Sequence, residues 1–216
     1  MRYCLTLGAA MLAAGCNGAA TAGNDQAAGN GAAPSAAASS PDDIAMNAIG
    51  EFDRVCRDLS DIDQLRESVP AAGWQEYEPE ANSDVARLLA FANTTVKEAV
   101  PDAEFANWSY RKSAGGRDLV LVLTDLSGPG ESTECRVYDF AAATPPIQEA
   151  LRRWTQASPT NTVSQQGMTA FQWSPGFRDN LTQLSVLHLD ANSPLRQRIP
   201  GVGLAVTAVL SNIPAQ

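Results

Sequence analysis

The sequence predicts an α+β domain in which one antiparallel sheet of about six strands has its helices packed on one face. Three observations lead to this fold class. The first part of the chain has apolar residues at helical spacing, the second part has short alternating or Val- and Leu-rich runs, and turns containing Gly or Pro separate those runs. The predicted order of elements is ααα-βββ-α-βββ.

The first predicted helix begins at Pro41. Ser40 suits the N-cap, proline suits the first helical position, and Asp42 and Asp43 suit the positive end of the helix dipole. The apolar residues that recur at helical spacing, and so form one inward-facing stripe, are Ile44, Ala48, Ile49, Phe52, Val55, Cys56 and Leu59. Cys56 is therefore expected to face the core.

Two further helices are predicted before the sheet begins. Residues 60–63 have the form of a capping box and open a second helix that ends at Pro70. A third helix is expected to start after Asn82. The apolar residues predicted to lie on it are Val85, Leu88, Leu89 and Phe91.

The pattern changes near Pro101, where strands begin. The segments predicted as strands are residues 103–111, 117–126, 133–140, 168–174, 181–190 and 201–210. The first three read as a meander, with Cys135 on an inward-facing side. Between the third and fourth strands, Pro145 and Pro146 open a fourth helix. The residues expected on its buried stripe are Ile147, Ala150, Leu151 and Trp154.

The N-terminal segment reads as an export signal. Arg2 precedes an uncharged run over residues 5–14, which is shorter than the ~20 apolar residues of a membrane-spanning helix. The sequence LAAGC from Leu12 to Cys16 resembles the lipobox of bacterial lipoproteins, a resemblance that covers only about the first 18 residues. Ala13 departs from the Leu that the family most often has there, and ordinary cleavage after Ala22 is the alternative.

In that family, the cysteine receives diacylglycerol on its sulfur and a signal peptidase cuts before it. The resemblance therefore implies that residues 1–15 are a signal peptide and that Cys16 is lipidated, which would attach the protein to a membrane. Asn17 resembles the pattern of Gram-negative lipoproteins sent to the outer membrane. The expected location is the periplasmic face of the outer membrane.

The rest of the chain divides into a linker and one domain. Residues 16–40 begin with the lipidated Cys and continue as an Ala-, Gly-, Asn- and Ser-rich stretch without large apolar residues, which predicts a disordered linker. Residues 41–216 form a single domain. In an oxidising compartment, Cys56 and Cys135 are expected to form a disulfide, with two separate buried thiols as the alternative.

The charge of the chain is acidic and uneven. Residues 42–104 contain 15 acidic and 5 basic side chains, whereas residues 105–216 contain 8 acidic and 9 basic ones. This balance argues against binding nucleic acid, whose phosphates require Lys and Arg. A solvated acidic surface is the simplest interpretation, and a basic protein partner would be the complementary one.

No catalytic, cofactor-binding or metal-binding residues are predicted. His188, the only histidine, lacks a recognisable triad around it, and the acidic runs at residues 58–63 and 76–80 lack a calcium-loop spacing. The four tryptophans could line a groove, but each also fits a core position.

The predicted function is a non-catalytic binding or envelope-assembly module. Two alternatives remain open from the sequence. A small-ligand carrier would have an apolar cavity near the tryptophans, and a carboxylate-based hydrolase would have two acids converging in a pocket.

Overall fold

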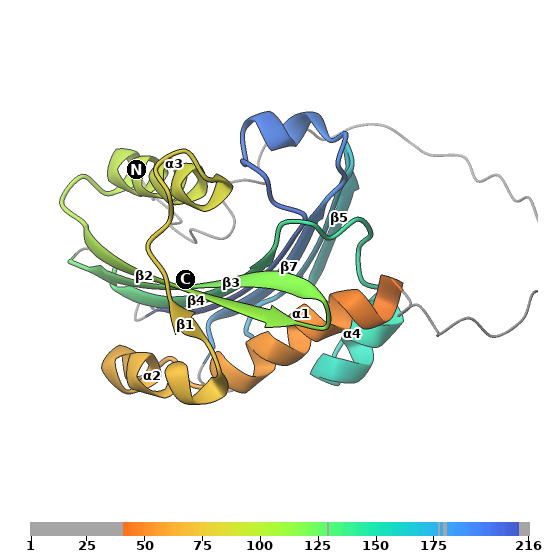
Figure 1. Ribbon diagram of the computed structural model, residues 1–216, viewed down its shortest axis with the longest axis horizontal. Coiled ribbons are helices and arrows are strands. Elements are labelled where there is room, and N and C mark those ends of the chain that lie inside the picture. Colours follow the sequence, from red (N-terminus) through yellow and green to blue (C-terminus); the bar gives the residue numbers. More distant parts are fainter. Residues whose placement is uncertain (1–40, 129, 177, 179–180, 212–216) are drawn as a thin grey trace, which may run out of the picture.

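The computed structural model describes residues 41–128, 130–176, 178 and 181–211. The predicted signal peptide, lipidation site at Cys16 and linker lie outside these residues. The described part of the chain is an α+β fold with four α-helices and an antiparallel sheet of eight strands (Figure 1).

The α-helices are α1 (Pro41–Val55), α2 (Ile62–Ser68), α3 (Asp84–Ala99) and α4 (Gln148–Thr155). Two short 3₁₀ helices are η1 (Pro70–Ala72) and η2 (Pro194–Gln197). The strands are β1 (Gln75–Glu76), β2 (Glu104–Ala114), β3 (Arg117–Ser127), β4 (Ser132–Asp139), β5 (Asn161–Gln165), β6 (Met168–Trp173), β7 (Gln183–Leu189) and β8 (Leu204–Ser211).

The strands lie in the order β1-β2-β3-β4-β8-β7-β6-β5, and every neighbouring pair is antiparallel. The predicted meander is β2-β3-β4, and β8 joins it to the second run of strands. At the β2-β3 turn, Gly115 and Gly116 have φ angles of 57° and 73°, which a two-residue hairpin turn of this kind requires.

The predicted number of about six strands was wrong, because β1 and β5 were missed. Both lie at the edges of the sheet. The two residues of β1 are exposed, and β5 reads NTVSQ, with Val163 as its only large apolar residue. An edge strand is held by hydrogen bonds to one neighbour and can bury little side-chain surface, so it leaves no apolar pattern in the sequence.

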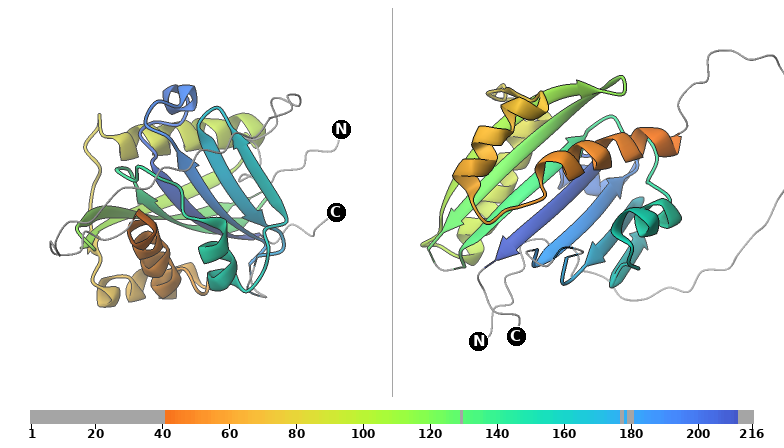
Figure 2. Two further views of the ribbon diagram at one scale, coloured as in Figure 1. Left: turned by 90° about the vertical axis from the view of Figure 1, so that its right-hand side faces the viewer. Right: turned by 90° about the horizontal axis from the view of Figure 1, so that it is seen from below.

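The helices do not share one face, which corrects a second expectation. Helices α1, α2 and α4 cover one face of the sheet, and α3 and η2 lie on the other (Figures 1 and 2). Phe52 of α1 belongs to the same core cluster as Leu121 of β3, whereas Leu88 of α3 is clustered with Val122. Alternate residues of a strand point to opposite faces, so β3, which is apolar on both sides, needs cover on both.

We call the two sides of the sheet the closed face and the cleft face. The closed face carries Leu119, Leu121 and Leu123 of β3 and is covered by α1, α2 and α4. The cleft face carries Val120 and Val122 and is partly covered by α3 and η2.

A disulfide joins the helices of the closed face to the sheet. Cys56, directly after α1, is bonded to Cys135 of β4 with a Cα–Cα distance of 5.7 Å, and both side chains are fully buried. The predicted pairing is confirmed. The cysteines are 79 positions apart, and closing a loop of that length stabilises the fold by about 4 kcal/mol in the chain-entropy model.

Two local predictions at helix N-termini differ from the structure. The N-cap of α2 is Asp61, whose carboxylate accepts a hydrogen bond of 2.9 Å from the backbone N–H of Gln64, rather than Ser60. Ile147 was expected on the buried stripe of α4 but is 48% exposed. It occupies the N-cap position with extended backbone, so its side chain is not in register with the helical stripe that follows.

Candidate functional site

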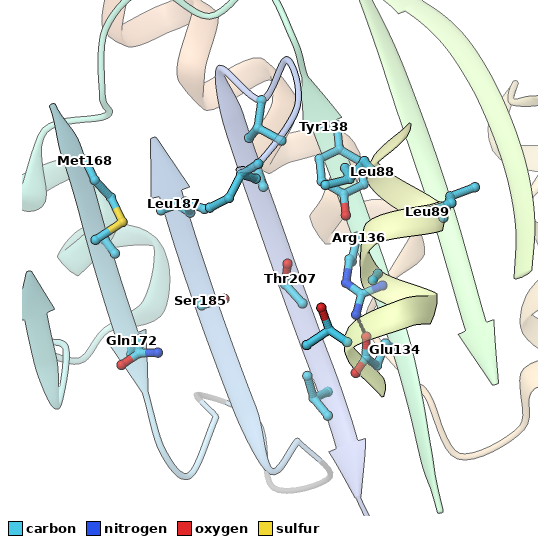
Figure 3. Close-up of a pocket in the computed structure, with 17 residues that line it drawn as sticks. Leu88, Leu89, Glu134, Arg136, Tyr138, Met168, Gln172, Ser185, Leu187 and Thr207 are labelled. Atoms are coloured by element: carbon cyan, nitrogen blue, oxygen red, sulfur yellow. Dashed lines mark ion pairs between the residues drawn. The ribbon is translucent and has the colours of Figure 1, made fainter. Parts of the chain in front are cut away.

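A cleft of about 130 Å³ lies on the cleft face, between α3 and the strands β4, β8, β7 and β6 (Figure 3). Leu88, Leu89 and Ala92 of α3 line it from the helix side. Ile199 and Val202, in the segment between η2 and β8, also contribute to its lining. The cleft exists because α3 covers only part of this face.

The register of the sheet sets the floor of the cleft. Directly opposed residues on four neighbouring strands form a polar row, which consists of Gln172, Ser185, Thr207 and Arg136. Two positions further along each strand, a second set of opposed residues forms an apolar row, which consists of Ala170, Leu187, Ala205 and Tyr138. All eight residues line the cleft.

The cleft therefore has two chemically different ends. Met168, Leu187 and Tyr138 lie at one end together with Leu88 and Leu89 (Figure 3). At the other end lie the residues of the polar row, together with Glu134 (Figure 3). An elongated molecule lying along the strands would contact both ends.

A buried ion pair anchors the polar end. The side chains of Glu134 and Arg136 pair with each other and are only 4% and 16% exposed. Arg136 Nη1 also donates to Thr124 Oγ1 at 3.3 Å, and that hydroxyl donates to Asn107 Oδ1 at 2.8 Å. Asn107 Nδ2 in turn donates to Asn93 Oδ1 of α3 at 3.4 Å, so the network connects the sheet with the helix.

Tyr138 stands at the border between the two ends. Its ring belongs to the apolar row, while its hydroxyl points toward Arg136 (Figure 3). Burial raises the pKa of the Tyr138 hydroxyl, and the nearby positive charge of Arg136 opposes this effect only in part. The phenol therefore stays protonated at neutral pH and can donate or accept a hydrogen bond.

His188 takes no part in the cleft. His188 alternates along β7 with Ser185 and Leu187, which line the cleft, and therefore lies on the closed face. Its imidazole is 1% exposed, with Nδ1 at 3.5 Å from Asp190 Oδ1. Burial lowers the pKa of His188 despite the carboxylate of Asp190, so the side chain is neutral at pH 7.

The tryptophans occupy core positions on the closed face, as the sequence indicated. Trp74 and Trp173 are buried, and Trp108 and Trp154 pack against the same core cluster. The alternative of a small-ligand carrier placed an apolar cavity near these residues, whereas the cleft lies on the opposite side of the sheet.

The acidic run at residues 58–63 has structural contacts. Asp61 caps α2, Asp63 pairs with Arg66 at 3.1 Å, and Asp58 accepts hydrogen bonds from Ser60. Among the described residues, no group of three or more His, Cys, Asp or Glu side chains is arranged to hold a metal ion.

None of the described helices is long and apolar enough to cross a membrane.

Sequence reasoning missed the cleft residues because it assigned one buried face to the sheet. In β4, Cys135 was predicted to face the core, and strand alternation then places Glu134 and Arg136 on the other side. A signal was present in the same strands, since Tyr138, Leu187 and Ala205 are apolar on the side assigned to water. Apolar residues on both sides of neighbouring strands predict cover on both faces.

Comparison of the chain with protein-family models, with curated proteins and with solved structures found no match. The geometry of the cleft and the chemistry of its lining therefore carry the functional argument.

Proposed function

We propose that this protein is a lipid-anchored, non-catalytic protein of the bacterial outer membrane that binds small apolar or amphiphilic molecules in the cleft beside α3. The observation that carries the proposal is the cleft itself, which is lined mainly by apolar side chains and has a small set of polar groups at one end. Ligand sites in proteins have this composition, because apolar contact supplies affinity and a few polar groups fix orientation.

The alternative of a carboxylate-based hydrolase receives no support from the cleft. Such an enzyme needs two carboxyl groups that converge on the substrate. Among the described residues that line the cleft, Glu134 is the single carboxylate, and its side chain is paired with Arg136.

The anchor is the second part of the proposal and rests on the sequence from Leu12 to Cys16. A lipidated cysteine would hold the binding domain beside a membrane, which is a source of amphiphilic molecules. Replacing Cys16 by Ser should move the protein from the outer-membrane fraction to the soluble periplasmic fraction, and mass spectrometry should show the loss of the acyl mass. A mature chain that begins after Ala22 without an acyl group would contradict the anchor.

Binding in the cleft can be tested with the dye N-phenyl-1-naphthylamine, whose fluorescence rises in apolar surroundings. The full chain carrying Cys16→Ser, produced under oxidising conditions, keeps attached lipid out of the assay. We expect a saturable rise in fluorescence. Ala92→Phe, which fills the cleft from α3, should weaken dye binding by tenfold or more.

Ala90→Phe is the matched control, because Ala90 lies on the same helix but is exposed and does not line the cleft. Its dye affinity should equal that of the unsubstituted chain. Absence of saturable binding, or equal weakening by both substitutions, would contradict the proposed site.

A further inference from the structure

The polar end of the cleft lies where a plain sheet-and-helix core would have apolar side chains. Each residue of the polar row directly opposes the next across neighbouring strands. With strands about 4.8 Å apart, the row spans about 14 Å, and the apolar row runs parallel to it about 7 Å away. A ligand lying along the strands would therefore place one segment on each row.

The described residues that line the polar end supply several hydrogen-bonding groups but no excess charge. Arg136 is paired with Glu134, and the remaining groups of the polar row are the uncharged side chains of Gln172, Ser185 and Thr207. A charged head group placed here would lose its hydration without gaining an unpaired counter-ion, which is costly. Hydroxyl or amide groups would meet donors and acceptors at no such cost.

The size of the cleft limits the apolar segment of the ligand. A cavity of about 150 Å³ holds one benzene molecule in a well-studied case, and this cleft measures about 130 Å³. It can enclose a short stretch of one alkyl chain.

We propose that the cleft binds single-chain amphiphiles with an uncharged, hydroxyl-bearing head group, such as monoacylglycerols. The head group lies on the polar row and the chain crosses the apolar row toward Met168 and Ile199. This assignment rests on the proposed function above and adds the chemical class and orientation of the ligand. Charge complementarity decides the class, because Arg136 and Glu134, the charged groups among the described residues that line the polar end, pair with each other.

The experiment is competition against N-phenyl-1-naphthylamine by three probes with the same chain length, each below its micelle concentration. The probes are 1-decanoylglycerol, decanoate and decyltrimethylammonium. We expect 1-decanoylglycerol to displace the dye at concentrations at least about tenfold lower than either charged probe.

Removing hydroxyls from the polar row tests the orientation. The double variant Ser185→Ala/Thr207→Val should weaken the binding of 1-decanoylglycerol roughly three- to tenfold more than it weakens the binding of the dye. Thr169→Val is the matched control, since Thr169 is also a half-buried strand threonine but faces the opposite side of the sheet, beside His188. It should leave both affinities unchanged.

The outcomes separate this inference from the proposed function. If the dye binds and Ala92→Phe blocks it, but decanoate or decyltrimethylammonium competes as well as 1-decanoylglycerol, the head-group assignment is overturned and the binding site stands. An affinity for 1-decanoylglycerol that falls no more than the affinity for the dye in Ser185→Ala/Thr207→Val would overturn the orientation. Failure of dye and all three probes to bind would overturn both proposals.

Discussion

The two faces of the sheet are built from the same strands but differ in how they are filled. On the closed face, Leu184 of β7 and Ala208 of β8 are completely buried beneath the helices. On the cleft face, Leu187 of β7 and Thr207 of β8 remain partly exposed and line a cleft. The strands supply apolar side chains to both faces, and the covering helices decide whether a face becomes core or binding surface.

Polar groups also differ between the faces. The closed face has a disulfide and a buried ion pair, in which Lys112 Nζ lies 2.6 Å from Glu51 Oε2 of α1. The cleft face has an ion pair and a polar row within its interior. Both faces therefore bury an ion pair, and the difference is that the polar row of the cleft face lines a cleft, where a ligand could contact it.

The largest expected effect is the loss of the bridge beneath the closed face. The double substitution Cys56→Ala/Cys135→Ala should lower the free energy of unfolding by about 4 kcal/mol, because the unfolded chain regains the entropy of an open loop. Guanidinium denaturation of the oxidised chain and the variant measures the difference. A loss below about 1 kcal/mol would show that the bridge does not secure this face.

A second comparison uses one strand and one type of substitution. Leu184→Ala should destabilise the fold by about 2–5 kcal/mol, because it leaves a cavity in a closed core, whereas Leu187→Ala, which only widens an existing cleft, should cost less than about 2 kcal/mol. Urea denaturation gives both values. Equal losses of unfolding free energy in the two variants would mean that the cleft face is packed as tightly as the closed face.

A third comparison enlarges a side chain on each face of β8. Ala208 is fully buried on the closed face, so Ala208→Leu should cost about 1–3 kcal/mol through overpacking. Ala205 lines the cleft, and Ala205→Leu should cost less than half as much while reducing dye binding. Thermal unfolding and the dye titration together provide the readout, and a reversed order of the two costs would contradict the contrast between faces.

The smallest expected effect is the pH dependence that His188 gives to the free energy of unfolding. Because burial lowers the pKa of His188 in the folded chain, the unfolded chain, with a pKa near 6.5, takes up the proton first as pH falls. The contribution of His188 to stability is complete above about pH 6.5 and is lost as pH falls toward its folded pKa. Arg196 adds to the lowering of that pKa, while Asp190 and a backbone hydrogen bond involving Ala142 oppose it.

The free energy of unfolding should therefore fall more steeply between about pH 7.5 and 5.5 in the unsubstituted chain than in His188→Gln. Urea denaturation at several pH values measures both slopes. Equal slopes would mean that the imidazole is protonated as readily in the folded chain as in the unfolded one.

The sequence was sufficient for the closed face and insufficient for the cleft face. The stripe that contains Phe52 and Cys56 predicted α1 and its buried side, and the inward position of Cys135 predicted the bridge. Helical spacing and strand alternation are local properties, so they can be recognised without knowing the rest of the fold.

The cleft depends on relations that no local pattern contains. The polar row forms only when β4 lies beside β8, and the pairing of strands distant in the chain is a property of the whole sheet. The side of the sheet on which α3 packs is decided by the connection through β1 at the edge, and a strand of two exposed residues leaves no mark in the sequence. Sequence reasoning therefore recovered the four α-helices, six of the eight described strands and one core, and missed the cleft.

The Cys56–Cys135 bridge also determines how the fold would respond to mechanical force. A pull on the chain through its N-terminal end reaches the described fold at α1, and the disulfide passes that load directly to β4 in the middle of the sheet. The segment between the two cysteines, which includes α3, β2 and β3, is shielded from the tension. If the proposed lipid anchor transmits movements of the membrane to α1, the disulfide would thus leave α3, the helix that lines the cleft, unloaded.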